Sequence, residues 1–142
     1  MTIVRTARDE DELAAALALR HNVFVLEQGV PVEEEQDGRD GEALQLVALD
    51  GDRLIGTCRV LEHAGEARLG RMAVAAEQRG RGVASLLLDA AEAQARARGA
   101  ARMVLDAQIG AQSFYERAGY VARGERFLDA GIEHVRMEKA LA

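Results

Sequence analysis

The 142-residue sequence contains only one cysteine and one proline. Because Cys58 stands alone, the chain can form no internal disulfide and no cysteine cage for a metal. It lies in the apolar segment LIGTCRVL, where a small buried residue of a strand is the ordinary interpretation and a nucleophile would need a neighbouring base. The sequence has no His/Cys cluster at ligand spacing, and Asp37 and Asp40 lack the twelfth-position glutamate of an EF-hand loop. We therefore expect no metal site.

The sequence also lacks a long hydrophobic run and a signal peptide. No apolar run is long enough to span a bilayer, and the start, MTIVRTARDEDEL, has no charged-then-apolar pattern. The formal net charge of −6 argues against a general nucleic-acid binder. Lysine occurs only at position 139, so arginine supplies the other cations, and each arginine is assigned a role here only by its position. We expect one soluble, cytoplasmic domain over 1–142 that binds neither nucleic acid nor membrane.

Hydrophobic periodicity predicts an α+β domain around a mixed sheet. Two alternating apolar runs flank Asp50-Gly51-Asp52, which is a strong hairpin signal. Strands joined by hairpins come first, and strands alternating with helices follow. The expected order is a strand (2–6), a helix within 8–27, a loop (28–43), a hairpin (43–62), a strand (66–75), a helix beginning near 83, a strand (102–108), a short helix (110–119) and two last strands (120–141).

The loop over 28–43 is long for a compact domain and strongly acidic. It holds the only proline, three glycines and six acidic residues, and long loops are often functional. Its run from Glu33 to Asp40 is open to two interpretations. One is a solvated surface, which is the usual meaning of a charge run. The other is an acceptor site that attracts a cationic amine.

The segment EQRGRGVASLLL places two glycines and two arginines before an apolar-periodic helix. It is either a glycine-rich turn or an anion site, because helix starts present unpaired N–H groups and glycines admit a ligand close to the backbone. Two other phosphate loops are excluded. A P-loop needs Lys-Ser/Thr after its glycines, and a dinucleotide fingerprint needs Gly or Ala where this chain has Ser85.

Two segments in order, from Leu54 to Val121, resemble the GCN5-related N-acetyltransferase (GNAT) family. The acyl-CoA motif of the family, R/Q-x-x-G-x-G/A, is similar to the segment LGRMAVAAEQRGRGVASLLL, although Ala76 stands where proline is common. The second family segment is similar to LDAQIGAQSFYERAGYV. LRHNVFVLEQGVPVEEEQDGRD and GIEHVRM resemble a subgroup of small bacterial members of unknown substrate. The resemblance implies a mixed, mostly antiparallel, twisted sheet flanked by helices.

The resemblance also implies where acetyl-CoA, the cosubstrate, would bind. Pantetheine would lie along the strand that carries Met72, Ala73 and Val74, with a backbone N–H near Val74 polarising the thioester carbonyl. Many relatives carry Asn at the end of the later strand, where Gln108 could keep an amide contact to pantetheine. The pyrophosphate would bind the backbone N–H groups of Arg79, Gly80, Arg81, Gly82, Val83, Ala84 and Ser85.

The implied reaction is direct transfer of an acetyl group to a primary amine in a ternary complex. Tyr115 matches the family tyrosine near the thiolate and is the predicted general acid, while Phe114 is expected to be the core residue of the same helix. Glu27 is the first choice for the general base. His134 is an alternative, since histidine as a residue type exchanges protons near neutral pH. A water relay without a dedicated base is a third possibility.

Three functions fit this resemblance. The first is an amine N-acetyltransferase acting on a small amine or a peptide, and Tyr115 favours it. The second is a non-catalytic acyl-CoA-binding or sensor domain. The third is acyl-homoserine-lactone synthesis, which is less compatible because such synthases are usually longer. The exposed late strands could also pair in a homodimer.

Overall fold

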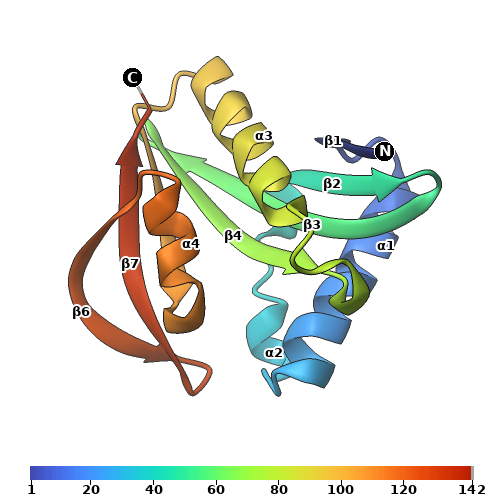
Figure 1. Ribbon diagram of the computed structural model, residues 1–142, viewed down its shortest axis with the longest axis horizontal. Helices are drawn as coiled ribbons and strands as arrows, with labels where there is room; N and C mark the ends of the chain where they lie inside the picture. The colour runs from blue at the N-terminus through green and yellow to red at the C-terminus, as the bar shows by residue number, and fades with distance from the viewer. Residues whose placement is uncertain (142) are drawn as a thin grey trace.

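The computed structural model describes residues 1–141 and contains a seven-stranded mixed sheet with helices on both faces (Figure 1). The strands are β1 (Thr2–Thr6), β2 (Leu44–Asp50), β3 (Arg53–His63), β4 (Glu66–Val74), β5 (Arg102–Gln108), β6 (Val121–Asp129) and β7 (Ile132–Ala140). The α-helices are α1 (Glu10–Arg20), α2 (Val32–Glu35), α3 (Val83–Ala97) and α4 (Gln112–Arg117). The predicted α+β class is confirmed.

The strands follow the order β1-β2-β3-β4-β5-β7-β6. Every neighbouring pair is antiparallel except β4 and β5, which are parallel. A parallel pair needs a crossover connection, and α3 supplies it. Within residues 1–141, the junction between β4 and β5 is therefore the one place where neighbouring strands run in the same direction.

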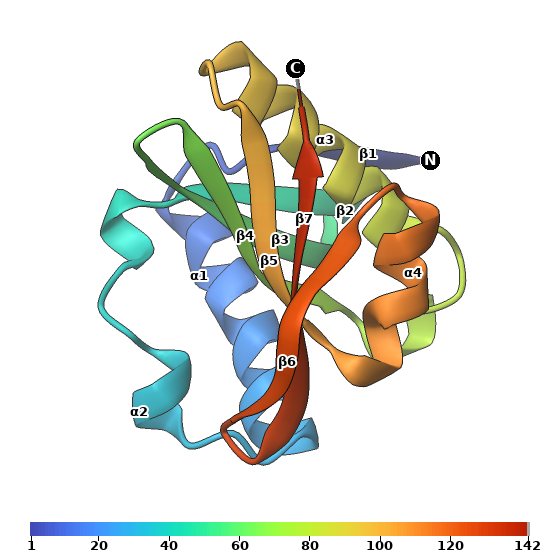
Figure 2. The ribbon, with the colours of Figure 1, turned by 90° about the vertical axis from the view of Figure 1, so that its left-hand side faces the viewer.

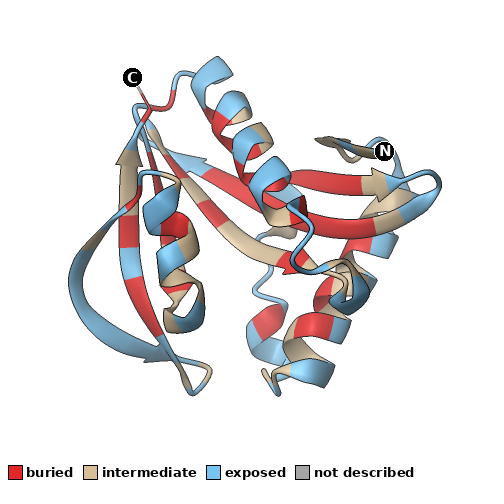
Figure 3. Cartoon of the chain, viewed as in Figure 1, coloured by how far each residue is buried: buried red, intermediate tan, exposed pale blue. Residues whose placement is uncertain are grey.

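The helices divide between the two faces of the sheet (Figure 2), with α1 and α2 on one side and α3 and α4 on the other. Helix α3 buries Leu87, Leu88 and Ala91 against the sheet. Gly56 of β3 lets α3 come close, because a Cβ at this position would lie 2.9 Å from Val83 Cγ1. Figure 3 shows the buried residues on β2, β3 and the inner turns of α3, while the edge strand β6 is almost entirely exposed.

The predicted helix over 8–27 forms, but in two parts. Asp9 caps α1 by accepting a hydrogen bond from the Glu12 N–H at 2.9 Å, as the acidic start predicted. After Arg20 the chain continues as a π-helix, η1 (His21–Glu27), in which Gln28 N–H bonds to Val23 O. Such segments are rare and often occur at functional sites, because the extra residue per turn changes the direction of the following side chains.

The acidic segment 28–43 is less irregular than predicted. It contains the short helix α2 and a 3-10 turn, η2 (Asp40–Glu42), where the sequence indicated only a loop. Within 1–141, no helix is long and apolar enough to cross a membrane.

Candidate active site

Strands β4 and β5 pair over only four residues each and then separate. Glu66–Leu69 pairs with Arg102–Leu105, but β4 continues to Val74 and β5 to Gln108. In Figure 1, β4 and β7 lie close at the top and diverge below, so the sheet opens as a V. The facing edges of β4 and β5 in the V have no partner strand, and an extended ligand could add there by strand-like hydrogen bonding.

A β-bulge in β4 marks the point where the strands separate. Cys58 of β3 lies opposite both Arg71 and Met72, since the register shifts between Thr57 and Arg59. Arg71 has a φ of 55°, and the other two non-glycine residues with positive φ lie in hairpin turns. A bulge bends its strand and redirects a side chain. Strained backbone of this kind is common at functional sites.

Beyond the bulge, the backbone of Val74 faces the opening. Ala75 N–H bonds to Ile55 O at 2.9 Å. In an antiparallel ladder, the residue before such a donor directs its own N–H and C=O to the other side. The Val74 carbonyl indeed accepts from Arg79 Nε at 3.1 Å, on the side away from β3. The Val74 N–H is therefore directed into the V, close to where the resemblance implied a donor for the thioester carbonyl.

The glycine segment forms an exposed turn that ends at the start of α3. Gly82 is the N-cap of α3 with a φ of 84°, and Gly80 has a φ of 78°. An added Cβ at either glycine would meet no atom within 4 Å, so conformation rather than space requires glycine there. No side chain caps α3, which leaves its first N–H groups open. Arg81 is exposed beside them.

Arg79 and Glu27 form an exposed ion pair beside Val74, at the end of β4. Arg79 Nη1 and Nη2 donate to the Glu27 carboxylate at 2.6 and 2.9 Å. The hydrogen bonds from Arg79 lower the pKa of Glu27. Both carboxylate oxygens of Glu27 therefore accept hydrogen bonds from Arg79. The sequence suggested Glu27 as the base, but it is not among the residues that line the cavity between β4 and β5.

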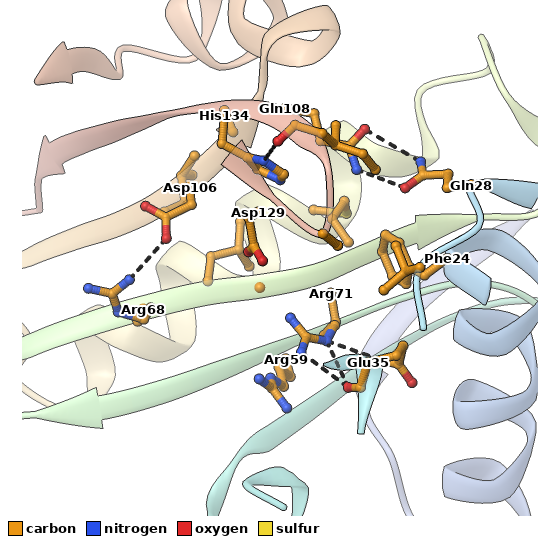
Figure 4. Close-up of a pocket in the computed structure, with 18 of the residues that line it drawn as sticks. Phe24, Gln28, Glu35, Arg59, Arg68, Arg71, Asp106, Gln108, Asp129 and His134 are labelled. Carbon is orange, nitrogen blue, oxygen red and sulfur yellow. Dashed lines mark hydrogen bonds and ion pairs between the residues drawn. The ribbon is translucent and has the colours of Figure 1, made fainter. Parts of the chain in front are cut away.

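A cavity of about 280 Å³ lies at the V (Figure 4). Its walls come from β4 and β5, from the end of the π-helix, from α2 and from the β6–β7 turn. Four of the predicted residues line it: Met72, Gln108, Tyr115 and the alternative base His134. Ala73, Val74, Glu27 and the predicted glycine segment are not among its lining residues. The cavity thus brings the predicted acid together with only one of the two predicted bases.

Tyr115 packs in the core and also reaches the cavity. It is 7% exposed and makes edge-to-face contacts with Phe114 and Tyr120. Burial raises the pKa of Tyr115, with a smaller contribution from nearby Cys58, so its hydroxyl stays protonated at neutral pH. The prediction that Phe114 is the core residue of this helix is wrong, because Phe114 is only partly buried against the core.

A polar network behind Tyr115 joins α3 to the end of the sheet. The Tyr120 hydroxyl donates to Glu92 Oε2 at 2.8 Å. Lys139 Nζ lies 2.9 Å from Glu92 Oε1 and 5.6 Å from the centre of the Tyr120 ring. These contacts connect α3 and β7 to Tyr120, which directly precedes β6 and packs against the Tyr115 ring.

Gln108 and His134 are neighbours across β5 and β7, and both side chains are already oriented. Gln108 exchanges two amide hydrogen bonds with Gln28, at 2.9 and 3.4 Å. His134 is 9% exposed, stacks on Phe127, and has Nδ1 2.7 Å from Ile132 O. If Nδ1 donates to this carbonyl, Nε2 carries the free lone pair. Figure 4 shows both residues along the same edge of the cavity.

The acidic segment packs against buried arginines, which neither interpretation of it predicted. Three carboxylates, Glu35, Asp37 and Asp40, pair with Arg20, Arg59 and Arg71. We call these six residues the arginine–carboxylate cluster. The Arg20 side chain is 1% exposed and lies 2.6 Å from both Glu35 and Asp40. The cluster holds α2 against the sheet, and its members Glu35, Arg59 and Arg71 line the cavity.

The cluster sets the charge state of its own acids. The hydrogen bonds from Arg59 lower the pKa of Asp37 despite partial burial. Burial alone would raise the pKa of Asp40, but the hydrogen bond and charge of Arg20 lower it overall. Asp37 and Asp40 are therefore ionised, and each of the three arginines pairs with at least one of them, as buried charges require. In 1–141, no three His, Cys, Asp or Glu side chains are grouped to hold a metal ion.

The profile of a known domain family, the acetyltransferase (GNAT) domain, matches residues 6–141. The chain belongs to the GNAT acetyltransferase family. The uncharacterized N-acetyltransferase YjcF of Bacillus subtilis is 39% identical over 134 residues, which are 94% of this chain and 96% of that protein.

Solved GNAT structures share the fold. A candidate N-acetyltransferase from Lactobacillus plantarum is 33% identical, with a TM-score of 0.92 and 99% of each chain covered. An aminoglycoside 6'-N-acetyltransferase complexed with coenzyme A is 16% identical, with a TM-score of 0.78 and coverage of 99% of this chain and 97% of that one. At this identity, the second likeness shows the fold alone.

Several residues that line the cavity of this GNAT protein were missed by the sequence interpretation. They are Gln28, Arg59, Arg68, Arg71 and Asp129. One signal was available: the three arginines stand inside the apolar strand segments LIGTCRVL and EARLGRMAV. A cation in a buried strand needs a partner. The acidic segment 33–40 was the obvious source of carboxylate partners for these arginines. Which carboxylate pairs with which arginine is set by tertiary contacts, which the sequence does not reveal.

Proposed function

We propose that the protein transfers an acetyl group from acetyl-CoA to a primary amine by direct attack in a ternary complex. The observation that carries this proposal is the V between β4 and β5, which opens beside the uncapped start of α3 and ends at Tyr115. An anionic group, an extended thioester arm and a proton acceptor would meet complementary groups in that order, at the start of α3, along β4 and at the Tyr115 hydroxyl.

Coenzyme A fits the residues present. Its pyrophosphate would accept hydrogen bonds from the open N–H groups between Arg79 and Ser85, with Arg81 adding positive charge. Its pantetheine arm would pair with the free edge of β4 from Met72 to Val74. Gln108 would assist only after release from Gln28.

The reaction requires charge stabilisation on the thioester oxygen and two proton movements. The Val74 N–H is directed into the V and would donate to the carbonyl oxygen as negative charge develops there. The amine nitrogen bonds to the carbonyl carbon, and the carbon–sulfur bond then breaks. Tyr115 would give its proton to the leaving thiolate, and its raised pKa keeps that proton available at neutral pH.

The proton that the amine loses has two candidate acceptors. We favour His134, because it lines the cavity and because Nδ1 donation to Ile132 O leaves Nε2 free to accept. Glu27 stays a prediction, but its carboxylate is occupied by Arg79 and lies outside the cavity. His134→Gln should reduce kcat about a hundredfold at pH 7, whereas Glu27→Gln should retain most of it. The opposite order would assign the base to Glu27.

The proposal is tested by incubating the protein with acetyl-CoA and a panel of primary amines while free thiol is measured. Cys58 is the only thiol of the chain, and burial raises its pKa to about 12, so the reagent reports released coenzyme A. Amine-dependent thiol release supports an acetyltransferase. Tight acetyl-CoA binding by calorimetry, without release for any amine, would instead support the acyl-CoA-binding or sensor function.

A further inference from the structure

The cavity has a cationic wall whose donors are not all used. Arg59 Nε is one of two buried side-chain polar atoms that lack a hydrogen-bond partner in 1–141, and Arg59 itself is 4% exposed. Arg71 uses Nε and Nη2 in the arginine–carboxylate cluster, and no bond to Nη1 occurs within the described residues. An unpaired buried donor is costly, so this wall is suited to an additional acceptor group.

Arg68 adds a surplus positive charge to the same wall. Its nearest carboxylates are Asp106, 3.5 Å from Nη1, and Glu66, 3.9 Å from Nη2. Each already has a closer arginine, since Arg136 lies 2.9 Å from Asp106 and Arg102 lies 2.7 Å from Glu66. Three arginines thus share two carboxylates, and Arg68 is the one held most loosely. Figure 4 shows Arg68 and Arg71 along the same side of the cavity.

Gly70 lies between these arginines and leaves the wall uncovered. A Cβ at this position would come to 3.9 Å from Arg59 Nε, with no closer contact. Gly70 is not among the glycines with positive φ, so its backbone would accept an ordinary side chain. The glycine is therefore not needed for the chain to fold here. Its effect is to keep open the space in front of the arginine wall.

Two exposed carboxylates of the cavity have no cationic partner in residues 1–141. They are Glu34 of α2 and Asp129 of the β6–β7 turn. They lie on segments other than the strands that carry the arginines, and His134 lies on the same hairpin as Asp129. The cavity therefore carries cationic groups on β3 and β4 and anionic groups on α2 and the β6–β7 turn.

We propose that the acceptor is a zwitterion, a small primary amine that also carries a carboxylate. This inference rests on the proposed function and names the substrate class of the same site. Arg68, Arg71 and Arg59 bind the carboxylate across Gly70. Glu34 and Asp129 attract the ammonium group, which loses its proton at His134 before the nitrogen attacks the thioester.

The test uses matched amines with and without the carboxylate. Glycine, 4-aminobutanoate and 6-aminohexanoate are each compared with their carboxamides in the thiol-release assay, and 1,4-diaminobutane serves as a dication. At least one amino carboxylate should have a higher kcat/KM than its amide. We call kcat/KM for the amino carboxylate divided by kcat/KM for its amide the acid-to-amide ratio. In Arg68→Gln, this ratio should fall about tenfold to a hundredfold, as expected for losing a charged hydrogen bond. Comparing the ratio between proteins cancels the intrinsic reactivities of the amines.

Two further variants keep the test specific. Gly70→Val should fill the space before Arg59 and lower the same ratio, while its fold is retained. Arg123→Gln removes an exposed arginine that pairs with Glu138 outside the cavity, and its ratio should equal that of the unmodified protein. Equal ratios in Arg68→Gln, Gly70→Val and Arg123→Gln would overturn the assignment, as would a preference for 1,4-diaminobutane.

A binding measurement separates this inference from the proposed function. The coenzyme A-loaded protein is titrated by calorimetry with N-acetyl-4-aminobutanoate, N-acetyl-6-aminohexanoate and their amides. One outcome is that an N-acetylated acid binds the unmodified protein, binds Arg68→Gln more weakly, and no amine causes thiol release. This outcome would retain the carboxylate site and reject the acetyltransferase. Thiol release with no difference between acids and amides in either assay would retain the acetyltransferase and reject the zwitterion. No binding and no release would reject both.

Discussion

The two sides of the V are built from different kinds of groups. On the side proposed for coenzyme A, the donors would be backbone N–H groups at the start of α3, which has no side-chain cap. On the side proposed for the acceptor, the cavity is bordered by the arginine–carboxylate cluster, whose side chains come from α1, α2, β3, β4 and the segment 37–40. The first is local in sequence and exposed, and the second is long-range and largely buried.

This difference explains what each side tolerates. A site made of backbone N–H groups depends on chain conformation. Substituting its glycines should therefore weaken ligand binding, whereas substituting the side chains beside them should change it little. A buried cluster of ion pairs depends on every member, because removing one charge leaves its partners unpaired. We therefore expect substitutions on the two sides to differ in which property they damage.

The largest effect is expected at the centre of the acceptor side. Arg20→Met keeps much of the side-chain volume but leaves Glu35 and Asp40 without their shared partner. The free energy of unfolding should fall by about 3 to 5 kcal/mol, as for other broken buried pairs. Urea denaturation monitored by circular dichroism measures this change. Arg53→Met, at an exposed arginine of the β2–β3 hairpin, is the control and should change it by less than about 0.5 kcal/mol.

The next effect is expected at Tyr115, where the two sides meet. Tyr115→Phe removes only the hydroxyl, so kcat should fall about a hundredfold while the calorimetric Kd for acetyl-CoA stays unchanged. Tyr120→Phe is the matched control, because its hydroxyl binds Glu92 away from the cavity. It should lose about 1 kcal/mol of stability and keep most of its turnover. Full turnover in Tyr115→Phe would remove Tyr115 from the role of acid.

A smaller effect is expected on the coenzyme side, and only at a glycine. Gly82→Val places a β-branched residue at a φ of 84°, which costs about 1 to 2 kcal/mol, and should weaken coenzyme A binding about tenfold. Arg81→Ala removes one exposed charge and should weaken it about twofold to threefold. Gly65→Val, at a φ of 80° in the β3–β4 turn, controls for strain and should leave binding unchanged. Stronger damage from Arg81→Ala would contradict a backbone site.

The smallest effect is a loss of stability in acid that is confined to the acceptor side. The pKa values of Asp37 and Asp40 are lowered in the folded protein. Their contribution is therefore complete above about pH 4, the range of free carboxylates, and is lost as the pH falls below it. Thermal melts from pH 6 to pH 3 should show a steeper loss in the unmodified protein than in Asp37→Asn. Equal slopes would mean that Asp37 is not held by Arg59.

The same difference explains how much the sequence predicted. The local structure on the side proposed for coenzyme A was predicted because its residues are contiguous: the strand up to Val74, the glycines and the apolar stripe of α3 lie within one segment. The α+β class and the order of strands and helices along the chain followed from hairpin and helix signals in the same way, whereas the order of the strands within the sheet was not predicted. Tyr115 was placed through the resemblance, and its position in the cavity agrees with that placement.

The acceptor side was not predicted because its contacts join distant segments. Arg59 and Asp37 are separated by 22 residues, and Arg71 and Glu35 by 36, so no spacing rule connects them. The π-helix was also missed, since its sequence, HNVFVLE, continues an ordinary helical pattern. The sequence suggested Glu27 as the base because it stands just before the acidic segment. In the structure, Glu27 is the last residue of the π-helix and pairs with Arg79 instead.

The Lys139–Glu92 contact has a practical consequence for a protein that handles an activated acetyl group. The chain has a single ε-amine, and its ammonium is held by Glu92 beside the Tyr120 ring. A protonated, ion-paired amine is a poor nucleophile, so self-acetylation on lysine should be minimal during storage with acetyl-CoA. Intact-mass spectra of the incubated protein would then give a clean baseline, against which acetyl groups on a co-incubated acceptor protein can be counted.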